Sequence, residues 1–175
     1  MGADFQPHIT ISSGIPLSSD IDYQSLIFSI ALLETPPKIQ FKKIRYGTAF
    51  WTKITLELHK TESLKELAVD CRSHVVPGVD EDIAREWVEQ YCTPAEVGIE
   101  GFIPHLSLVY WDSEVKAAVR KQVEEEVGKA GITTDEVELE VIGDMGGFQG
   151  GKLVFVDTTK KVEEWRDLIL AERQL

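Results

Sequence analysis

The sequence predicts a fold that mixes helices and strands, either in one domain or in two small lobes that share a core. Three observations support this prediction. The 175 residues are enough to bury an apolar core without disulfide or metal links. The 43% hydrophobic and 27% charged residues are ordinary for a soluble globular protein. Apolar residues recur at every second position in some segments and with helical spacing in others.

The first part of the chain should contain one short strand and one helix. In residues 7–12, Ile9 and Ile11 point to one face, whereas the polar residues between them point to the other. A turn-rich stretch follows. Residues 23–34 then place apolar side chains at helical spacing, and the helix should stop before Pro36.

The middle of the chain should contain two strands and two helices. Alternating apolar and polar residues predict strands at 38–46 and 49–58. An apolar stripe predicts a helix at 61–75 with Thr61 as its N-cap, and an acidic helix is expected at 80–91.

The second half should begin with a loop at 93–101 and a strand at 104–110. A helix at 114–129 follows, where valine recurs every four residues, and Asp112 and Ser113 stand at its start. The rest is predicted as strand, loop, strand and helix at residues 137–142, 143–151, 152–156 and 160–171, respectively.

The charge of the chain limits its partners. The net charge is −12, from 30 acidic and 18 basic residues. This balance argues against binding of duplex nucleic acid, which requires clustered cations. The stretch 35–56 nevertheless contains five basic residues and no acidic one: Lys38, Lys42, Lys43, Arg45 and Lys53. This positive stretch is either a solvated strand face or a surface that attracts an anionic nucleotide or RNA end.

The chain carries no apolar run long enough for a transmembrane helix, and its first residues lack the features of a signal peptide. The two cysteines, Cys71 and Cys92, are expected to be reduced thiols. We therefore expect a cytoplasmic protein that does not engage membranes.

One pentapeptide pattern occurs twice, as Pro-His-Ile-Thr-Ile near the N-terminus and as Pro-His-Leu-Ser-Leu in the second half. On a strand, residues two apart share a face. The first copy therefore places His8 beside Thr10. The second copy places His105 beside Ser107 in the same way. Two such strands side by side would gather two imidazoles and two hydroxyls.

That set of groups suits the cleavage of a cyclic phosphodiester. Imidazole, with an unperturbed pKa of roughly 6.5, can serve as base for water or as acid for a departing ribose oxygen. Hydroxyls can donate to the phosphate oxygens where charge develops. No carboxylate or thiol stands at a ligand spacing from these histidines, so we expect no metal and no other cofactor.

The paired motifs resemble those of the two-histidine (2H) phosphoesterases. Residues 5–10 and 102–110 are similar to the first and second motifs of the fungal and plant cyclic-nucleotide phosphodiesterase branch of that superfamily. The resemblance covers the whole chain. It implies a two-lobed α+β fold with pseudo-twofold symmetry, in which antiparallel sheets line a central cleft and helices lie outside.

The resemblance also implies roles for single residues. It makes His8 and His105 the acid–base pair, with His105 favoured as the base, and Thr10 and Ser107 the phosphate-binding residues. Tyr110 matches a tyrosine that contacts the substrate. Strict strand alternation would point Tyr110 away from His105, so this role requires a bulge or the end of the strand.

The activity implied by the resemblance is hydrolysis of 2′,3′-cyclic nucleotides to 2′-phosphates. A second implied substrate is ADP-ribose 1″,2″-cyclic phosphate from tRNA splicing, which would give the 1″-phosphate. Two alternatives remain open. One is an RNA 2′,5′-ligase-like or RNA-end phosphodiesterase of the same superfamily, which the acidic charge disfavours. The other is a nucleotide-binding module that keeps the fold without catalysis.

Members of the family usually have a strand and a helix before the first motif, whereas this chain begins at that motif. We therefore expect a single two-lobed domain over residues 1–175 that lacks those two elements. Such a domain would be a monomer, or it would self-associate through the uncovered edge of a sheet.

Overall fold

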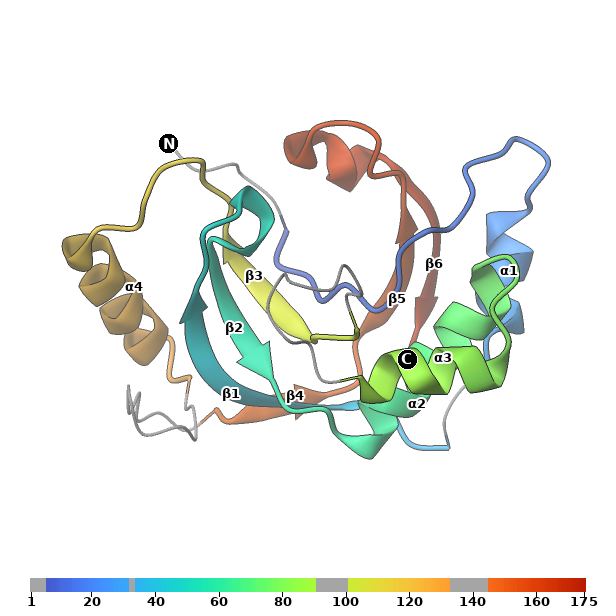
Figure 1. The fold of residues 1–175 in the computed structure, drawn as a ribbon, viewed down its shortest axis with the longest axis horizontal. Helices are drawn as coiled ribbons and strands as arrows, with labels where there is room; N and C mark the ends of the chain where they lie inside the picture. The colour runs from blue at the N-terminus through green and yellow to red at the C-terminus, as the bar shows by residue number, and fades with distance from the viewer. Residues whose placement is uncertain (1–5, 32–33, 91–100, 133–144) are drawn as a thin grey trace.

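The computed structural model of the chain describes residues 6–31, 34–90, 101–132 and 145–175 (Figure 1). Cys92, the strand expected at 137–142 and nearly all of the loop expected at 93–101 lie outside these residues. The helices are α1 (Tyr23–Ser29), α2 (Glu62–Val75), α3 (Glu81–Glu89), α4 (Ala117–Lys129) and the 3₁₀ turns η1 (Phe50–Thr52) and η3 (Val162–Asp167). The strands are β1 (Lys38–Tyr46), β2 (Ile54–Leu58), β3 (His105–Val109), β4 (Gly147–Gln149), β5 (Lys152–Val156) and β6 (Ile169–Gln174).

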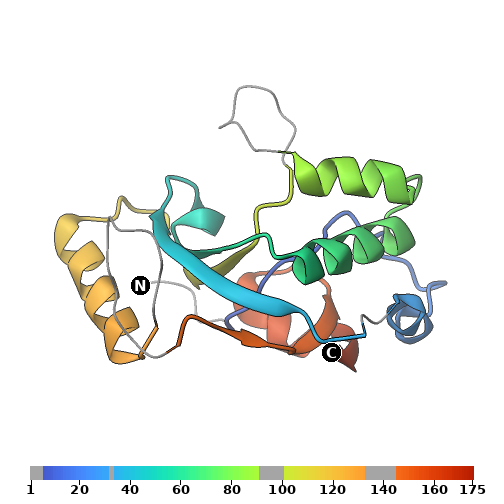
Figure 2. The same cartoon turned by 90° about the horizontal axis from the view of Figure 1, so that it is seen from below.

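The strands form two antiparallel sheets. One contains four strands in the order β3-β2-β1-β4, and the other consists of β5 and β6 (Figures 1 and 2). The first motif lies beside the four-stranded sheet, because Ile9 forms an isolated antiparallel bridge with Leu106 of β3. The expected α+β fold with antiparallel sheets and helices is thus confirmed.

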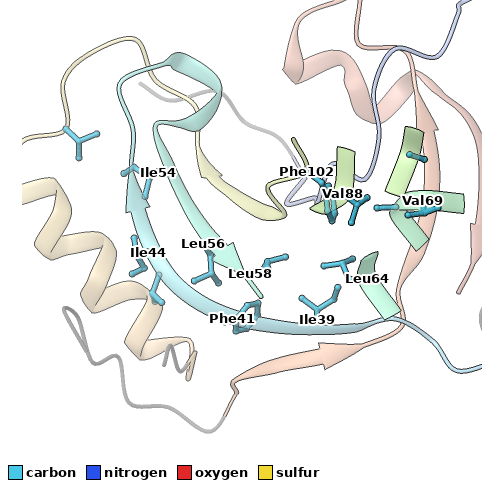
Figure 3. Packing of buried hydrophobic residues seen from close by; sticks show 14 residues of the cluster. Ile39, Phe41, Ile44, Ile54, Leu56, Leu58, Leu64, Val69, Val88 and Phe102 are labelled. Carbon is cyan, nitrogen blue, oxygen red and sulfur yellow. The ribbon is translucent and has the colours of Figure 1, made fainter. Parts of the chain in front are cut away.

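Two clusters of buried side chains join the sheets to the helices. The larger one lies between the four-stranded sheet and the helices, and Figure 3 shows it from nearby. The second joins α1 to the two-stranded sheet. Helix α2 contributes to both, with Leu64 and Ala68 in the larger cluster and Leu67 and Cys71 in the second. Its apolar stripe therefore links the two sheets. The side chain of Ile11 packs against both clusters, so the first motif runs between them.

Several elements have the predicted bounds. The strands at 38–46 and 152–156 are confirmed at both ends. Thr61 caps α2 as predicted, since its hydroxyl accepts a hydrogen bond from the backbone N–H of Leu64 at 3.4 Å. No helix among the described residues is long and apolar enough to cross a membrane.

The strand predicted at 7–12 is wrong as an extended ladder, because the structure has only the single bridge at Ile9. Pro7 has no N–H to donate and so cannot extend the pairing on its side. The helix predicted at 23–34 ends at Ser29. Ile30 is extended there, and its carbonyl accepts a hydrogen bond from the Arg173 guanidinium at 2.8 Å. The Arg173 guanidinium thus donates to a carbonyl that, in a longer helix, would accept from a backbone N–H of the next turn.

The strand predicted at 49–58 begins only at Ile54, because residues 50–52 form η1. The backbone N–H of Gly47 donates to the carbonyl of Lys53 at 3.0 Å and closes this connection. The predicted helix start at Asp112 and Ser113 is also wrong. Helix α4 begins at Ala117, and no side-chain hydrogen bond caps it.

The loop predicted at 143–151 contains strand β4, which pairs with β1. Gly147 makes this possible, since a Cβ at that position would lie 1.9 Å from the carbonyl oxygen of Ile39. The helix predicted at 160–171 is wrong in its second half. After η3 the chain turns at Leu168 and forms β6, whose backbone groups pair along β5. Strand pairing thus prevails over helical spacing in this segment.

Candidate active site

The two predicted histidines have the same local geometry. The Nδ1 atom of His8 lies 2.9 Å from the carbonyl oxygen of Gln6, two residues earlier. The Nδ1 atom of His105 lies 2.9 Å from the carbonyl oxygen of Ile103, again two residues earlier. A carbonyl only accepts, so Nδ1 carries the proton in both rings. In each case Nε2 is the nitrogen left for chemistry.

The bridge between Ile9 and Leu106 brings the two motifs side by side. Both aliphatic side chains pack against the larger core cluster. The residues before and after them therefore face the opposite side of the sheet. Antiparallel pairing reverses the order of the two motifs. If the pairing continued by one residue on each side of the bridge, it would set His8 across from Ser107, and Thr10 across from His105.

The exposure of the four motif side chains differs. Ser107 is buried, with 3% of its surface exposed, whereas Thr10 is exposed at the edge of the site. Both histidines are half-buried. Part of each imidazole is therefore accessible from solvent.

Tyr110 joins this group through an irregularity of strand pairing. The register of β2 and β3 shifts between Ile54 and Thr55, so that Ser107 and Val109 pair with consecutive residues. Leu108 is therefore the extra residue of a bulge. The bulge and the strand end at Val109 turn Tyr110 to the side of Ser107. The expected role of Tyr110 requires such an irregularity.

The hydroxyl of Tyr110 lies 3.2 Å from Nε2 of His8. Burial raises the pKa of the Tyr110 phenol, and a hydrogen bond with the Ser107 side chain partly offsets this effect. The phenol ring stacks on Phe50 of η1, with centroids 5.7 Å apart. The fold thus brings His8, Ser107 and Tyr110 into one cluster.

Trp165 also contacts this cluster, although no motif in the sequence pointed to it. Its ring centroid lies 5.6 Å from that of His8, and its indole N–H donates to the carbonyl of Lys160 at 3.1 Å. The residue belongs to η3, which the helical pattern merged into a longer helix. Nothing in the sequence pattern connected that segment with the first motif.

The neighbouring strand β2 adds two polar residues to the same face. Thr55 of β2 pairs with Ser107, and Glu57 pairs with His105. Paired residues of an antiparallel ladder share a face. Alternation in residues 49–58 predicted that Thr55 and Glu57 share a face, but not which strand lies beside them. Within the described residues, no group of three or more histidine, cysteine or acidic side chains is arranged to hold a metal ion.

The whole chain is similar to known cyclic phosphodiesterase-like proteins. The family model described as cyclic phosphodiesterase-like protein matches residues 2–175. A protein of Phaeosphaeria nodorum named 2′,3′-cyclic-nucleotide 3′-phosphodiesterase is 33% identical over 174 residues, which cover 98% of this chain and 81% of the relative. Proteins of the same name from Neurospora crassa and Yarrowia lipolytica are each 28% identical, over 94% of this chain and 76% and 82% of the relatives. The chain belongs to the cyclic phosphodiesterase-like family.

Proposed function

We propose that the chain is a hydrolase, a 2′,3′-cyclic-nucleotide 3′-phosphodiesterase in which His8 and His105 form the acid–base pair. The family and the names of three fungal relatives support this activity. The observation that carries the mechanism is the matched geometry of the two rings. Both histidines bond a carbonyl two residues earlier at 2.9 Å, on segments joined by the bridge between Ile9 and Leu106.

The reaction needs one neutral and one protonated imidazole. The neutral ring takes a proton from water as the water oxygen bonds to phosphorus. The bond between phosphorus and the 3′ oxygen breaks, and the protonated ring gives its proton to that oxygen. The product is a 2′-phosphate monoester, and proton exchange with solvent restores the starting states. The pseudo-symmetric geometry fits either assignment of base and acid.

Thr10 and Ser107 are proposed to donate hydrogen bonds to the non-bridging phosphate oxygens. Such donors stabilise the charge that develops on those oxygens in the transition state. Tyr110 is proposed to contact the substrate from the side of His8, where its hydroxyl already lies. In this proposal the protein's own side chains carry all proton transfers, and no metal takes part.

The proposal extends to ADP-ribose 1″,2″-cyclic phosphate and to a place in the turnover of tRNA-splicing products. The acidic chain supports small substrates over long RNA, because its net charge of −12 repels a polyanion. A second candidate function is an RNA-end phosphodiesterase. The basic residues of β1 favour it, because they stand on the same sheet as the second motif.

Turnover of 2′,3′-cyclic AMP by the purified chain tests the proposal. Phosphorus NMR should show 2′-AMP as the product, and chelators should leave the rate unchanged. Formation of 3′-AMP would overturn the regiochemistry. Loss of activity with chelator and its recovery with zinc or magnesium would refute the metal-free mechanism. Binding of 2′-AMP without any turnover would identify a nucleotide-binding module instead.

A further inference from the structure

The register of three neighbouring strands extends the proposed site across the sheet. Ser107 of β3 pairs with Thr55 of β2, and Thr55 pairs with Arg45 of β1. His105 pairs with Glu57, and Glu57 pairs with Lys43. Residues paired in antiparallel ladders project from the same face. Arg45 and Lys43 therefore share the face of the second motif.

The packing of Tyr46 confirms this orientation. The hydroxyl of Tyr46 donates to the Glu124 carboxylate of α4 at 2.9 Å, and the Arg120 guanidinium lies 4.8 Å from the centre of its ring. Tyr46 thus points to the helix that covers the other face of the sheet. Because successive residues of a strand alternate, its neighbour Arg45 points to the face of the motif. Arg45 is exposed there.

A bulge concentrates positive charge beside the site. The register of β1 shifts between Phe41 and Lys43, so that Lys42 and Lys43 both lie opposite Glu57. The ammonium of Lys42 forms an ion pair with Glu57 at 3.2 Å. Arg45 adds a third basic side chain to the same face. In a chain with a net charge of −12, this is a local concentration of basic residues.

The other two basic residues of the stretch 35–56 lie away from this group. The ammonium of Lys53 is held inside the protein, where it donates to the carbonyl of Thr48 at 2.7 Å. Lys38 lies at the far end of β1, paired with Gln149 of β4. The stretch seen in the sequence thus reduces to a compact group around Lys43 and Arg45.

The spacing of this group suits a second anion on the same substrate. Neighbouring strands are about 4.8 Å apart, so β1 lies about 10 Å from β3. A long arginine or lysine side chain spans much of that distance. Its charged end would then stand about one sugar away from a phosphate held by the two motifs. Arginine presents a planar fork of donors that matches phosphate oxygens, and lysine adds a compact charge.

We propose that Lys43 and Arg45 form a second-anion subsite, which binds a phosphate on the 5′ side of the ribose that carries the cyclic phosphate. This inference rests on the proposed function and names its substrate class. The preferred substrates are small cyclic nucleotides that carry a 5′-phosphate, rather than nucleoside cyclic phosphates without one. A few cations suffice for a single phosphate group, whereas a duplex requires many.

The test compares adenosine 2′,3′-cyclic phosphate with its 5′-phosphorylated form. For the unmodified chain, kcat/KM should be at least about tenfold higher for the 5′-phosphorylated substrate, the effect of one charge-assisted contact. In Arg45→Gln, and further in the double variant with Lys43→Gln, this ratio should fall toward one. Arg85→Gln is the matched control, because Arg85 lies on α3 in an ion pair with Glu81. It makes the same change in net charge and should keep the ratio.

Two outcomes would overturn the subsite while the proposed function stands. In the first, the unmodified chain hydrolyses both substrates, but the ratio of their kcat/KM values is near one. The other is an equal fall of the ratio in Arg45→Gln and Arg85→Gln, which would indicate an effect of net charge alone. A dinucleotide that ends in the cyclic phosphate tests whether the second phosphate is a 5′-monoester or part of an RNA strand. A higher kcat/KM for the dinucleotide than for the 5′-phosphorylated mononucleotide would contradict the assignment to small nucleotides.

Equilibrium binding makes the subsite testable without turnover. Adenosine 2′,5′-bisphosphate should bind at least about tenfold more tightly than 2′-AMP, and Arg45→Gln should remove most of that difference. If the chain hydrolyses neither substrate but shows this difference, the catalytic proposal fails and the subsite stands. If both ligands bind equally, the subsite is refuted whether or not the chain is active.

Discussion

Ile9 and Leu106 face each other in an antiparallel bridge, although they stand in opposite halves of the sequence. Both side chains pack against one core cluster, so the polar residues beside them share the other side. The bridge places the two similar pentapeptides side by side, with both histidines and both hydroxyl residues in the paired segments. The predictions about the site depend on this pairing.

The two histidines should act as a unit. We expect His8→Gln and His105→Gln each to lower turnover of 2′,3′-cyclic AMP at least about 10²-fold, because proton transfer by a positioned side chain contributes about that much. The double variant should lose little more, since the two proton transfers belong to one displacement at phosphorus and the loss of either interrupts it. Steady-state kinetics measure the effect, and thermal unfolding checks that the variants are folded.

His74→Gln is the control for this experiment. Its Nδ1 bonds the carbonyl of Asp70 on the exposed side of α2 at 2.9 Å, and it lies outside the proposed site. Near-normal activity in a folded His8 or His105 variant would contradict the acid–base assignment.

Tyr110→Phe should lower kcat/KM about tenfold, the cost of one hydrogen bond of about 1.4 kcal/mol. The substitution removes the hydroxyl that lies 3.2 Å from Nε2 of His8 and keeps the ring stacked on Phe50. Burial raises the pKa of Tyr110, so the phenol stays protonated above the range where an exposed tyrosine ionises. The alkaline limb of the pH–rate profile should therefore be the same in the variant. Loss of that limb would show that Tyr110 is the group that titrates there.

Ser107→Ala should lower kcat about 10²-fold with little change in KM, because the proposed hydrogen bond strengthens in the transition state. Thr55→Val is a matched variant, since Thr55 is an equally buried hydroxyl directly across from Ser107. It should change kcat much less. Equal losses of activity in the two variants would indicate a structural role for both hydroxyls.

The sequence predicted those elements whose pattern is decided within the segment. Strand β1 alternates clearly over most of its length, and Thr61 has the side chain that caps a helix, so both were predicted correctly. The segment 160–171 has helical spacing too, but its second half lies beside β5 and forms the second strand of that sheet. A pattern within one segment does not show which neighbour will pair with it.

The same limit applies to the candidate site. Two histidines and two hydroxyls could be identified because the motif repeats in the sequence. Trp165 could not, since its contact with His8 joins opposite ends of the chain. The place of Arg45 beside Ser107 depends on two successive pairings, and the bulge in β1 shifts one of them. Register of this kind is set by packing and not by the local pattern of residues.

Stability at alkaline pH should depend on the Cys71 thiol in the core. Burial raises the pKa of Cys71 from 9.0 to about 12. Between these values the folded chain keeps a proton that the unfolded chain releases, so the free energy of unfolding falls as pH rises through this window. At pH 10.5 the loss should be about 2 kcal/mol, at roughly 1.36 kcal/mol for each unit above pH 9.

Urea unfolding at pH 8 and pH 10.5 measures this loss in the unmodified chain and in Cys71→Ala. The variant should be less stable at pH 8, because it leaves a gap in the core, but it should lose about 2 kcal/mol less between the two pH values. Burial and the neighbouring Glu124 also raise the pKa of Tyr46, and this effect cancels because both proteins contain Tyr46. Val69→Ala is the packing control, since it opens a gap on the same helix but keeps the thiol. Its loss between pH 8 and pH 10.5 should match that of the unmodified chain, and an equal loss in Cys71→Ala would show that the buried thiol does not titrate as proposed.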